Sequence, residues 1–172
     1  MIRVKNIVLR KIDEADVENN WAAFLSLRND VDTALQILSR PFGQNREDIL
    51  TWIRSRNARS DCIFLGIFKE DGFLGYVMFT EECRISGVGE LSITLAAEAR
   101  GQGVAADVLE AFIAYLFDAL DYSKFYARIL ATNAASVRLF RQAGFSLVGV
   151  LHRHRRMRGQ YVDVELYEKL LR

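Results

Sequence analysis

Residues 98–112 read EARGQGVAADVLEAF, and two glycines and an arginine in this stretch precede a strongly amphipathic segment. Gly101 and Gly103 allow the backbone to turn tightly and to approach a ligand without an intervening Cβ atom. The first amides of a helix have no partner inside the helix, and they carry the positive end of its dipole. The stretch therefore predicts a helix N-terminus that binds a phosphate, to which Arg100 adds positive charge. An ordinary strand-to-helix turn with favourable glycines is the alternative.

The glycine turn also fits the dinucleotide-binding pattern G-x-G-x-x-[G/A] over residues 101–106. That pattern belongs to the first βαβ unit of a nucleotide-binding fold, where a carboxylate ends the following strand and binds a ribose. Here an antiparallel hairpin is predicted before the motif, and the next strand ends in the sequence ILATN without a carboxylate. The context therefore excludes a dinucleotide site.

Apolar periodicity and turn residues divide the chain into seven strands and four helices, without an internal repeat or linker. The predicted strands cover residues 2–10, 62–68, 73–80, 87–95, 124–131, 145–157 and 161–170, and the predicted helices cover 13–29, 45–57, 103–120 and 133–143. One hairpin precedes the glycine motif and another closes the chain, so the sheet must be mixed. We expect a single α/β (α+β) domain over residues 1–172.

The bulk composition describes a compact chain without an unusual charge balance. Of the 172 residues, 51% are hydrophobic and 26% are charged, and the net charge of +1 supplies no global field that would attract nucleic acid or a membrane. The first residues, MIRVKNIVLRK, lack the apolar run expected of a signal peptide, and no uncharged apolar run approaches the roughly 18 residues of a membrane span. Cys62 and Cys83 lack metal or redox spacing. We expect a cytoplasmic protein without a metal, a membrane anchor or a nucleic-acid partner.

A second motif, NAASVRLFRQAGF over residues 133–145, lies one strand downstream of the first. At this point the sequence resembles the GNAT superfamily of acetyl-CoA-dependent N-acetyltransferases. Residues 100–105, RGQGVA, meet the family signature [Q/R]-x-x-G-x-[G/A], and residues 133–145 meet N-x-x-[A/S]-x-x-[L/V]-[Y/F]-x-x-x-G-F. The resemblance covers residues 60–170 well and the first two helices only by position. The ending, with GVLH at 149–152 and GQY at 159–161, is similar to the branch of spermidine and ribosomal-protein N-terminal acetyltransferases.

The resemblance implies a mixed, mostly antiparallel seven-stranded sheet with helices on both faces. Its strands 4 and 5, here residues 87–95 and 124–131, would splay apart into a V-shaped cleft that binds acetyl-CoA. Asn133 would hydrogen-bond the pantetheine arm, although its position equally supports a role as helix N-cap. Backbone groups would bind the arm and the pyrophosphate, with two side chains of the second motif nearby; the residues implied are Ile93, Thr94, Leu95, Arg100, Gly101, Gln102, Gly103, Val104, Ala105, Ser136 and Phe140.

The same resemblance implies that Glu90 is the general base, because many relatives carry a glutamate at the start of this strand. A solvated or salt-bridged glutamate is the alternative. Many relatives also use a tyrosine as general acid at the position of Phe140, and phenylalanine cannot donate a proton. This departure leaves the general acid unassigned, with Tyr126 and Ser136 as candidates. It also keeps open a second function, that of an acetyl-CoA-binding regulatory module with little or no catalysis.

The acceptor is expected between the first two helices and the closing hairpin, with Arg28, Asn29, Phe42 and Trp52 as candidate substrate-binding residues. The pair of Arg28 and Asn29 resembles one found in acetyltransferases that act on amino-sugar nucleotides. The closing hairpin resembles the polyamine and protein N-terminal branch instead. The primary amine of a protein N-terminus, a polyamine or an amino-sugar nucleotide therefore stays open as the acceptor.

Residues 152–158, HRHRRMR, form the most basic segment of the chain. Alternate residues of a strand face opposite sides, and Asp163, Glu165 and Glu168 on the partner strand are expected to pair with these arginines. Solvated hairpin charge is therefore favoured over contact with RNA or the ribosome. The same hairpin is also a candidate seam for a homodimer.

Overall fold

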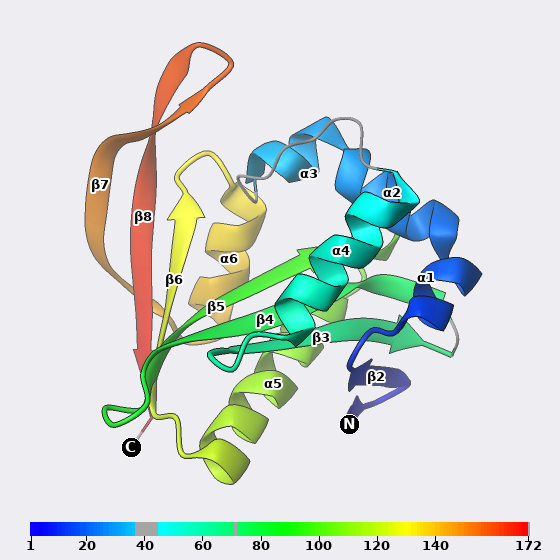
Figure 1. Ribbon diagram of the computed structural model, residues 1–172. Coiled ribbons are helices and arrows are strands. Elements are labelled where there is room, and N and C mark those ends of the chain that lie inside the picture. The colour runs from blue at the N-terminus through cyan, green and yellow to red at the C-terminus, as the bar shows by residue number, and fades with distance from the viewer. Residues whose placement is uncertain (37–44, 71, 172) are drawn as a thin grey trace.

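The computed structural model describes residues 1–36, 45–70 and 72–171, and its eight strands form one sheet in the order β1-β2-β3-β4-β5-β6-β8-β7 (Figure 1). The strands are β1 Ile2–Val4, β2 Ile7–Arg10, β3 Cys62–Lys69, β4 Gly72–Cys83, β5 Val88–Leu95, β6 Lys124–Leu130, β7 Ser146–Met157 and β8 Gln160–Leu170. The helices are α1 Glu14–Asn19, α2 Trp21–Asn29, α3 Val31–Gln36, α4 Arg46–Asn57, α5 Val104–Leu120 and α6 Ala134–Gln142, with a 3₁₀ turn at Ala97–Ala99.

The sheet is mixed, as predicted. β5 and β6 run parallel, and each of the other neighbouring pairs is antiparallel. The strand expected over residues 2–10 is divided into β1 and β2, which makes eight strands rather than seven. The chain reverses between them, because Lys5 adopts a left-handed φ of 52° and Val4 then faces Ile7 in an antiparallel pair.

Helices cover both faces of the sheet, as expected, and each face has its own apolar core (Figure 1). Residues of β3 alternate between the two faces, because successive side chains of a strand point in opposite directions. Ile67 packs in the core beneath α5 and α6, whereas Phe68 packs in the core beneath α2 and α4. Within the described residues, no helix is long and apolar enough to cross a membrane.

The helix predicted over residues 13–29 is broken at Asn20 into α1 and α2. The side chain of Asn20 accepts a hydrogen bond from the amide of Phe73 at 2.9 Å and donates one to the carbonyl oxygen of Asp16 at 3.1 Å. Asp13, where the predicted helix begins, caps α1 through a reciprocal capping box with Asp16. These contacts attach the first two helices to the start of β4.

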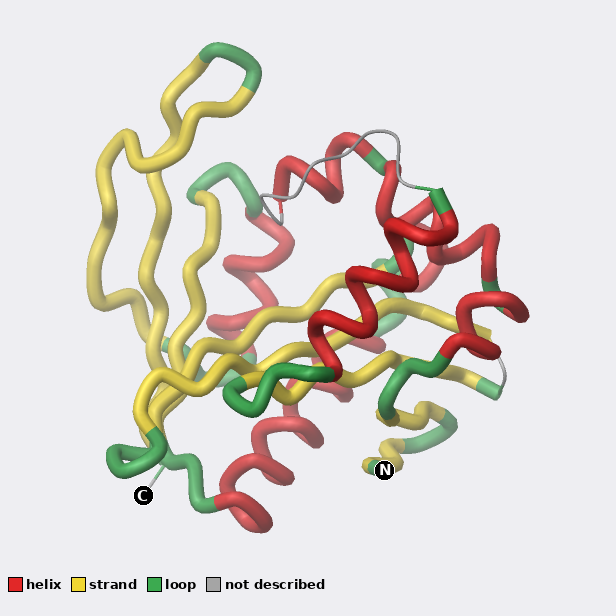
Figure 2. The backbone as a smooth tube through the Cα atoms, in the orientation of Figure 1, coloured by secondary structure: helices red, strands yellow, loops and turns green. Residues whose placement is uncertain are grey.

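The parallel pairing of β5 and β6 is short, and the two strands then diverge. It joins residues 88–90 to 124–126 and ends at the pair of Glu90 and Tyr126. Beyond that pair, β5 continues to Leu95 against β4, and β6 continues to Leu130 against β8. Figure 2 shows the two strands running apart from their common start. The predicted V-shaped splay is therefore confirmed.

The hairpin of β7 and β8 contains an irregularity that strand alternation did not predict. The register shifts between Leu151 and Arg155, and the side chain of Asp163 holds the displaced segment. Its oxygens accept from the backbone amide of Arg153 at 2.6 Å and face Nδ1 of His152 at 3.2 Å. Arg153 has a φ of 50° within this bulge.

The expected pairing of the hairpin arginines with the three carboxylates is wrong. Asp163 contacts the ring of His152 and the backbone amide of Arg153 rather than an arginine side chain. Glu165 accepts from the hydroxyl of Tyr167 at 2.7 Å, and Glu168 pairs with Lys124 at 2.8 Å. Arg158, near the tip of the hairpin, instead forms an ion pair of 2.8 Å with Asp32 of α3. The bulge shifts the basic segment out of simple alternation, and among the described contacts His152 is the one residue of that segment whose side chain meets a carboxylate of β8, that of Asp163.

Candidate active site

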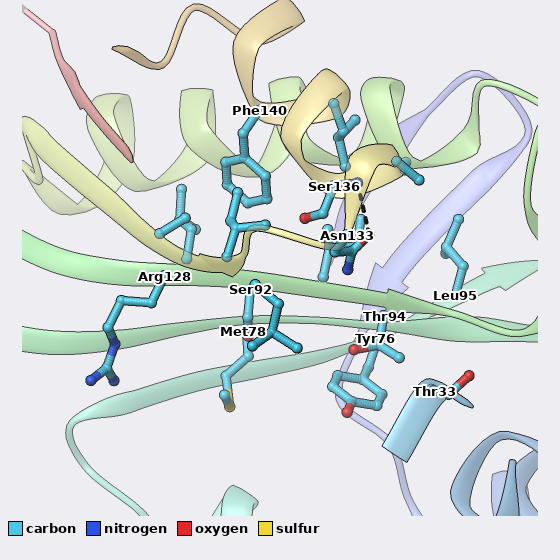
Figure 3. Close-up of a pocket in the computed structure, with 18 of the residues that line it drawn as sticks. Thr33, Tyr76, Met78, Ser92, Thr94, Leu95, Arg128, Asn133, Ser136 and Phe140 are labelled. Carbon is cyan, nitrogen blue, oxygen red and sulfur yellow. Dashed lines mark hydrogen bonds between the residues drawn. The ribbon is translucent and has the colours of Figure 1, made fainter. Parts of the chain in front are cut away.

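A cavity of about 840 Å³ occupies the splay between β5 and β6, a volume within the usual range for small-ligand sites. Its walls come from both faces of the sheet. α5 and α6 close one side, and α2, α4 and the β7–β8 hairpin close the other. Figure 3 shows Asn133, Ser136 and Phe140 on one side of β5, with Tyr76 and Arg128 on the other. The cavity therefore passes through the sheet.

Most of the predicted cofactor-binding residues line this cavity. Those that do are Ile93, Thr94, Leu95, Arg100, Gly101, Ala105, Asn133, Ser136 and Phe140. Gly103 and Val104 line a smaller adjoining hollow of about 190 Å³ between α5 and α6. Gln102 lines neither space, because its side-chain amide donates to the carbonyl oxygen of Glu98 at 2.6 Å. The backbone amide of Gln102 nevertheless lies next to the first backbone amides of α5.

The start of α5 has the geometry of an anion site. Gly101 and Gly103 have φ values of 74° and 78°, and a Cβ added to either would meet no atom within 4 Å. The glycines are thus needed for their backbone conformation, and the space in front of them is open. The carbonyl oxygen of Gly103 accepts from Ala106 and Asp107, whereas the amides of residues 102–105 donate to no acceptor in the described part of the chain. This open row of amides fits the pyrophosphate of acetyl-CoA.

Arg100 is directed at the end of β5 rather than at these amides. Its Nε and Nη2 donate to the carbonyl oxygen of Leu95 at 3.1 and 3.0 Å, and Nη2 also donates to Oγ1 of Thr33 at 2.6 Å. Thr33 in turn donates to the carboxylate of Asp30, from both its amide and its hydroxyl. Arg100 thereby connects the first turn of α3 to the wall of the cleft, in addition to any contact with a phosphate.

Three predicted cofactor residues share one face of α6, because positions 133, 136 and 140 follow helical spacing. The side chain of Asn133 accepts from the amide of Ser136 at 3.1 Å, so the N-cap role is present while the residue also lines the cavity. Phe140 is 2% exposed and packs edge-on against Phe145, with ring centroids 5.0 Å apart. α6 therefore presents an amide, a hydroxyl and an aromatic ring to the cleft (Figure 3).

Glu90 lies where the two strands part and lines the cavity. Both of its carboxylate oxygens accept from Arg128 of β6, from Nε at 2.9 Å and from Nη2 at 2.7 Å. Hydrogen bonding to Glu90 raises the pKa of the Arg128 guanidinium. The salt bridge that the sequence analysis gave as the alternative to a catalytic role is thus present. The side chain of Glu90 is nevertheless 23% exposed, and it lines the cavity.

Of the two candidates for the general acid, only Ser136 lines the cavity. Tyr126 faces Glu90 in the sheet, and burial together with hydrogen bonding to Glu82 raises its pKa to about 12. It lies outside the lining residues, so its hydroxyl is not placed to protonate a leaving group in the cleft.

Two of the four predicted acceptor-binding residues meet on the far side of the cavity. The Arg28 guanidinium carbon lies 4.4 Å from the centroid of the Trp52 ring, and that ring packs edge-on against Tyr76 at 5.3 Å. Asn29 ends α2 and does not line the cavity, whereas Phe42 lies outside the described residues. Of the predicted acceptor residues that the structure describes, Arg28 and Trp52 line the cavity and Asn29 does not.

Several lining residues were not predicted from the sequence. They are Arg56, Tyr76, Met78, Thr80, Arg128, His154 and Arg155. A signal existed for the three from β4, because a strand paired with residues 90–94 places alternate side chains beside Glu90 on the same face. Thr80 faces Glu90 in the sheet and Tyr76 faces Thr94. His154 and Arg155 carried no such signal, because the bulge determines where they point.

The model of the acetyltransferase (GNAT) domain family matches residues 6–146, which is most of the chain. The chain belongs to the GNAT acetyltransferase family. The resemblance stated from the two motifs is therefore confirmed, and the match extends over the first helices as well. As a member of this family, the chain is an acetyl-CoA-dependent N-acetyltransferase.

Similar proteins support the same family and fold. The chain is 27% identical over 133 residues to the ribosomal-protein-serine acetyltransferase of Escherichia coli strain K12, which covers 76% of this chain and 74% of the relative. The structure of a ribosomal L7/L12 α-N-protein acetyltransferase in complex with coenzyme A superposes with a TM-score of 0.88 at 22% identity, covering 99% of this chain and 97% of that one. Spermidine N-acetyltransferase from Vibrio cholerae, solved with CoA and spermine, gives 0.84 at 20% identity, covering 96% and 95%.

The residues of this GNAT acetyltransferase that can hold a cofactor suit an organic molecule such as acetyl-CoA rather than a metal ion. The open amides of α5 and the unpaired edge of β5 lie at one end of the cavity. Among the residues with a described placement, no group of three or more His, Cys, Asp or Glu side chains could hold a metal ion.

Proposed function

We propose that this acetyltransferase transfers the acetyl group directly from acetyl-CoA to a primary amine while both substrates occupy the cleft. The observation that carries the proposal is the end of β5–β6 pairing at Glu90. From that point, the edge of β5 that faces the cavity has no partner strand, and α5 presents unpartnered amides beside it. An extended ligand with a phosphate at one end fits both features.

On the cofactor side, acetyl-CoA supplies an activated acyl group. The backbone edge formed by Ile93, Thr94 and Leu95 would bind the pantetheine arm as an added strand. The amides of Gln102, Gly103, Val104 and Ala105 would bind the pyrophosphate. The side-chain amide nitrogen of Asn133 would donate to the arm from α6, while the oxygen caps that helix.

On the amine side, the acceptor must be neutral to attack. Deprotonating a lysine-like amine at pH 7 costs about 4 to 5 kcal/mol, whereas a protein N-terminus costs only about 1 kcal/mol. Glu90 would take the proton, directly or through a water, because each carboxylate oxygen has a second lone pair beyond its bond to Arg128. A backbone amide of residues 93–95 would stabilise the oxyanion that forms on the acetyl carbonyl.

The reaction then breaks the carbon–sulfur bond and releases the thiolate of coenzyme A. The unperturbed pKa of a thiol is near 8.5, so a proton donor assists the departure without being essential. Phe140 has no proton to give, and the hydroxyl of Ser136 is the nearest candidate on α6. In the balanced step, the ammonium loses one proton through Glu90 before it attacks, and Glu90 passes this proton to solvent. The nitrogen loses a second proton when the tetrahedral intermediate collapses, and the departing sulfur gains one from Ser136 or water. The second proton of the nitrogen restores that donor, so each turnover releases one proton.

The acceptor classes left open by the sequence remain a protein N-terminus, a polyamine and an amino-sugar nucleotide. The similarity to a ribosomal-protein acetyltransferase and to a spermidine acetyltransferase supports the first two. A homodimer and a cytoplasmic location also stay predictions. The edge strand β7 exposes Leu147, Val148, Val150 and Leu151, which makes it the candidate seam of such a dimer.

The test has two parts. Calorimetry with coenzyme A should show binding, and thiol release from acetyl-CoA should accelerate with at least one of an N-terminal peptide, spermidine and an amino-sugar nucleotide. Absence of binding overturns the assignment of the cleft. Binding without turnover on any amine favours the alternative that Phe140 raises, a regulatory module that binds acetyl-CoA.

A further inference from the structure

The acceptor side of the cleft carries an excess of positive charge. Among the described residues, the cavity is lined by Arg28, Arg56, Arg100, Arg128 and Arg155, but by only two carboxylates, Asp32 and Glu90. Both carboxylates already have a cation. Glu90 pairs with Arg128 at 2.7 Å, and Asp32 pairs with Arg158 at 2.8 Å. The cleft therefore offers little negative charge to a ligand.

Arg28 is built into the wall and is only 6% exposed. Its guanidinium stacks over Trp52, which is held in turn by Phe64 and Tyr76 at centroid distances of 5.2 and 5.3 Å. Burial, together with the positive charge of Arg56, lowers the pKa of Arg28, and hydrogen bonding to Tyr76 opposes this change. An arginine nevertheless stays protonated in a protein. Arg28 is therefore a fixed positive charge near that of Arg56.

Arg155 reaches the cavity because of the bulge in β7. The register shift after Leu151 places both His154 and Arg155 among the lining residues. The Nε of Arg155 is buried, and within the described chain it has no hydrogen-bond partner. A buried donor without an acceptor is destabilising, so such a group in a binding cleft points to an acceptor supplied by a ligand.

The phosphates of the cofactor are not the natural occupants of this positive region. The open amides at the start of α5 lie on the face covered by α5 and α6, where they adjoin the smaller hollow. Arg28 and Arg56 belong to α2 and α4 on the opposite face. The two regions of positive charge therefore serve different ligands.

We propose that the amine acceptor carries an anionic group, a phosphate or a carboxylate, and that Arg28, Arg56 and Arg155 bind this group while Glu90 faces the amine. The inference rests on the proposed transferase function. A polyamine, which brings additional ammonium groups to the same wall, is then a poor acceptor.

The experiment compares acceptors that differ in the anion alone. Glucosamine 6-phosphate is compared with glucosamine, and the peptide Ser-Glu-Glu amide with Ser-Gln-Gln amide, by the rate of thiol release from acetyl-CoA. Charge-assisted hydrogen bonds predict that the anionic member of at least one pair has a kcat/KM about tenfold or more above its neutral partner. The pair that shows the preference identifies the source of the anion. Spermidine should rank below both anionic probes.

Variants locate the preference in the structure. Arg155→Gln removes the charge in the bulge and should reduce the anionic preference about tenfold, with unchanged affinity for coenzyme A. Arg156→Gln is the matched control, because Arg156 is the next residue of the same strand, is exposed and does not line the cavity. Raising the salt concentration should reduce the preference in the unmodified protein and less so in the Arg155 variant.

The outcomes separate the two proposals. Turnover of neutral and anionic partners at equal rates, or faster turnover of spermidine, overturns the anionic acceptor and leaves the transferase function intact. Binding of coenzyme A without turnover of any probe overturns the transferase function. In that case calorimetry of the coenzyme A complex with glucosamine 6-phosphate and glucosamine still tests the anion site, and equal heats reject it.

Discussion

At the residue scale, the carboxylate of Glu90 accepts hydrogen bonds from Arg128 and also lines the cavity. Its replacement by glutamine tests whether Glu90 acts as the general base. We expect Glu90→Gln to reduce kcat/KM mainly below pH 8, by about 100-fold for an amine of high pKa and by less for an α-amine. Glu82→Gln is the control, because Glu82 is exposed and hydrogen-bonds Tyr126 outside the cavity. A pH–rate profile unchanged by Glu90→Gln would remove this residue from the mechanism.

Arg100 provides a second test at the same scale, because the structure gives it a bonding role that does not require a ligand. Arg100→Met removes three donated hydrogen bonds, to Leu95 twice and to Thr33 once. The half-exposed side chain limits the expected decrease in unfolding free energy of the ligand-free protein to about 1 kcal/mol. Urea unfolding measures it, with exposed Arg138→Met as control. Loss of coenzyme A affinity with unaltered ligand-free stability would contradict this assignment.

Sequence motifs located the cofactor residues better than the acceptor residues. Asn133, Ser136 and Phe140 follow from one motif on one helix, so local spacing sufficed to place them together. Arg56 and Arg155 come from elements distant in sequence, and they meet only because α4 crosses the sheet and β7 bulges. The hydrogen bond from Arg100 to Thr33 is equally non-local, because donor and acceptor lie 67 positions apart in the sequence.

At the scale of elements, the N-terminus of α5 depends on two glycines with left-handed φ. Gly103→Ala should destabilise the protein by roughly 1 to 2 kcal/mol, because a Cβ is disfavoured in this conformation. The variant should also bind coenzyme A more weakly. An alanine at position 103 has to adopt a strained left-handed φ to keep the amides of residues 102–105 in place. Thermal unfolding and calorimetry measure the two effects.

Gly149→Ala is the matched control for that change. Gly149 lies in β7, is not among the glycines of positive φ, and has no atom within 4 Å of an added Cβ. We expect its stability and coenzyme A affinity to match those of the unmodified protein. An equal loss in both variants would show that glycine substitution in general, rather than the turn before α5, accounts for the effect.

Element boundaries were predicted where local signals are strong and missed where long-range contacts decide. The helices expected from residues 13 and 45 begin there, because Asp13 and Asn45 each form a reciprocal capping box within the first turn. The break at Asn20 was missed, because the hydrogen bond to Phe73 comes from 53 residues away. The division of residues 2–10 at Lys5 was missed as well, since lysine is not a usual residue for positive φ.

At the scale of the whole molecule, buried and half-buried tyrosines make stability depend on alkaline pH. Burial is the main cause that raises the pKa of Tyr122, Tyr126 and Tyr167, and for Tyr126 the value is about 12 against a usual 10. Between these values the unfolded chain loses the Tyr126 proton while the folded chain keeps it, so stability is complete below pH 10 and falls as the pH rises toward 12.

Tyr126→Phe isolates one part of this effect. The variant cannot ionise at this position, so its unfolding free energy should fall less between pH 10 and pH 12 than that of the unmodified protein. Denaturant unfolding at several alkaline pH values provides the comparison. Parallel curves for the two proteins would mean that Tyr126 does not contribute to the alkaline loss.

The sheet order and the splay of β5 from β6 required more than periodicity. Hairpins and turn residues predicted which segments are strands, and the two hairpins already required a mixed sheet. Which strands part, and where, depends on β6 pairing with β8 instead of continuing along β5, a contact between segments about 40 residues apart. Only the family resemblance supplied that expectation, because a parallel pairing of three residues has no local signature.

A passage that crosses the sheet has a kinetic consequence. In the proposed arrangement, the cofactor lies against α5 and α6 and the acceptor against α2 and α4, so the two substrates would occupy different parts of the cavity. Either one can therefore arrive first, and we expect initial-rate lines that intersect, with coenzyme A competing against acetyl-CoA but not against the amine. Parallel lines would mean that one product departs before the second substrate binds, and they would contradict a cleft that holds both substrates at once.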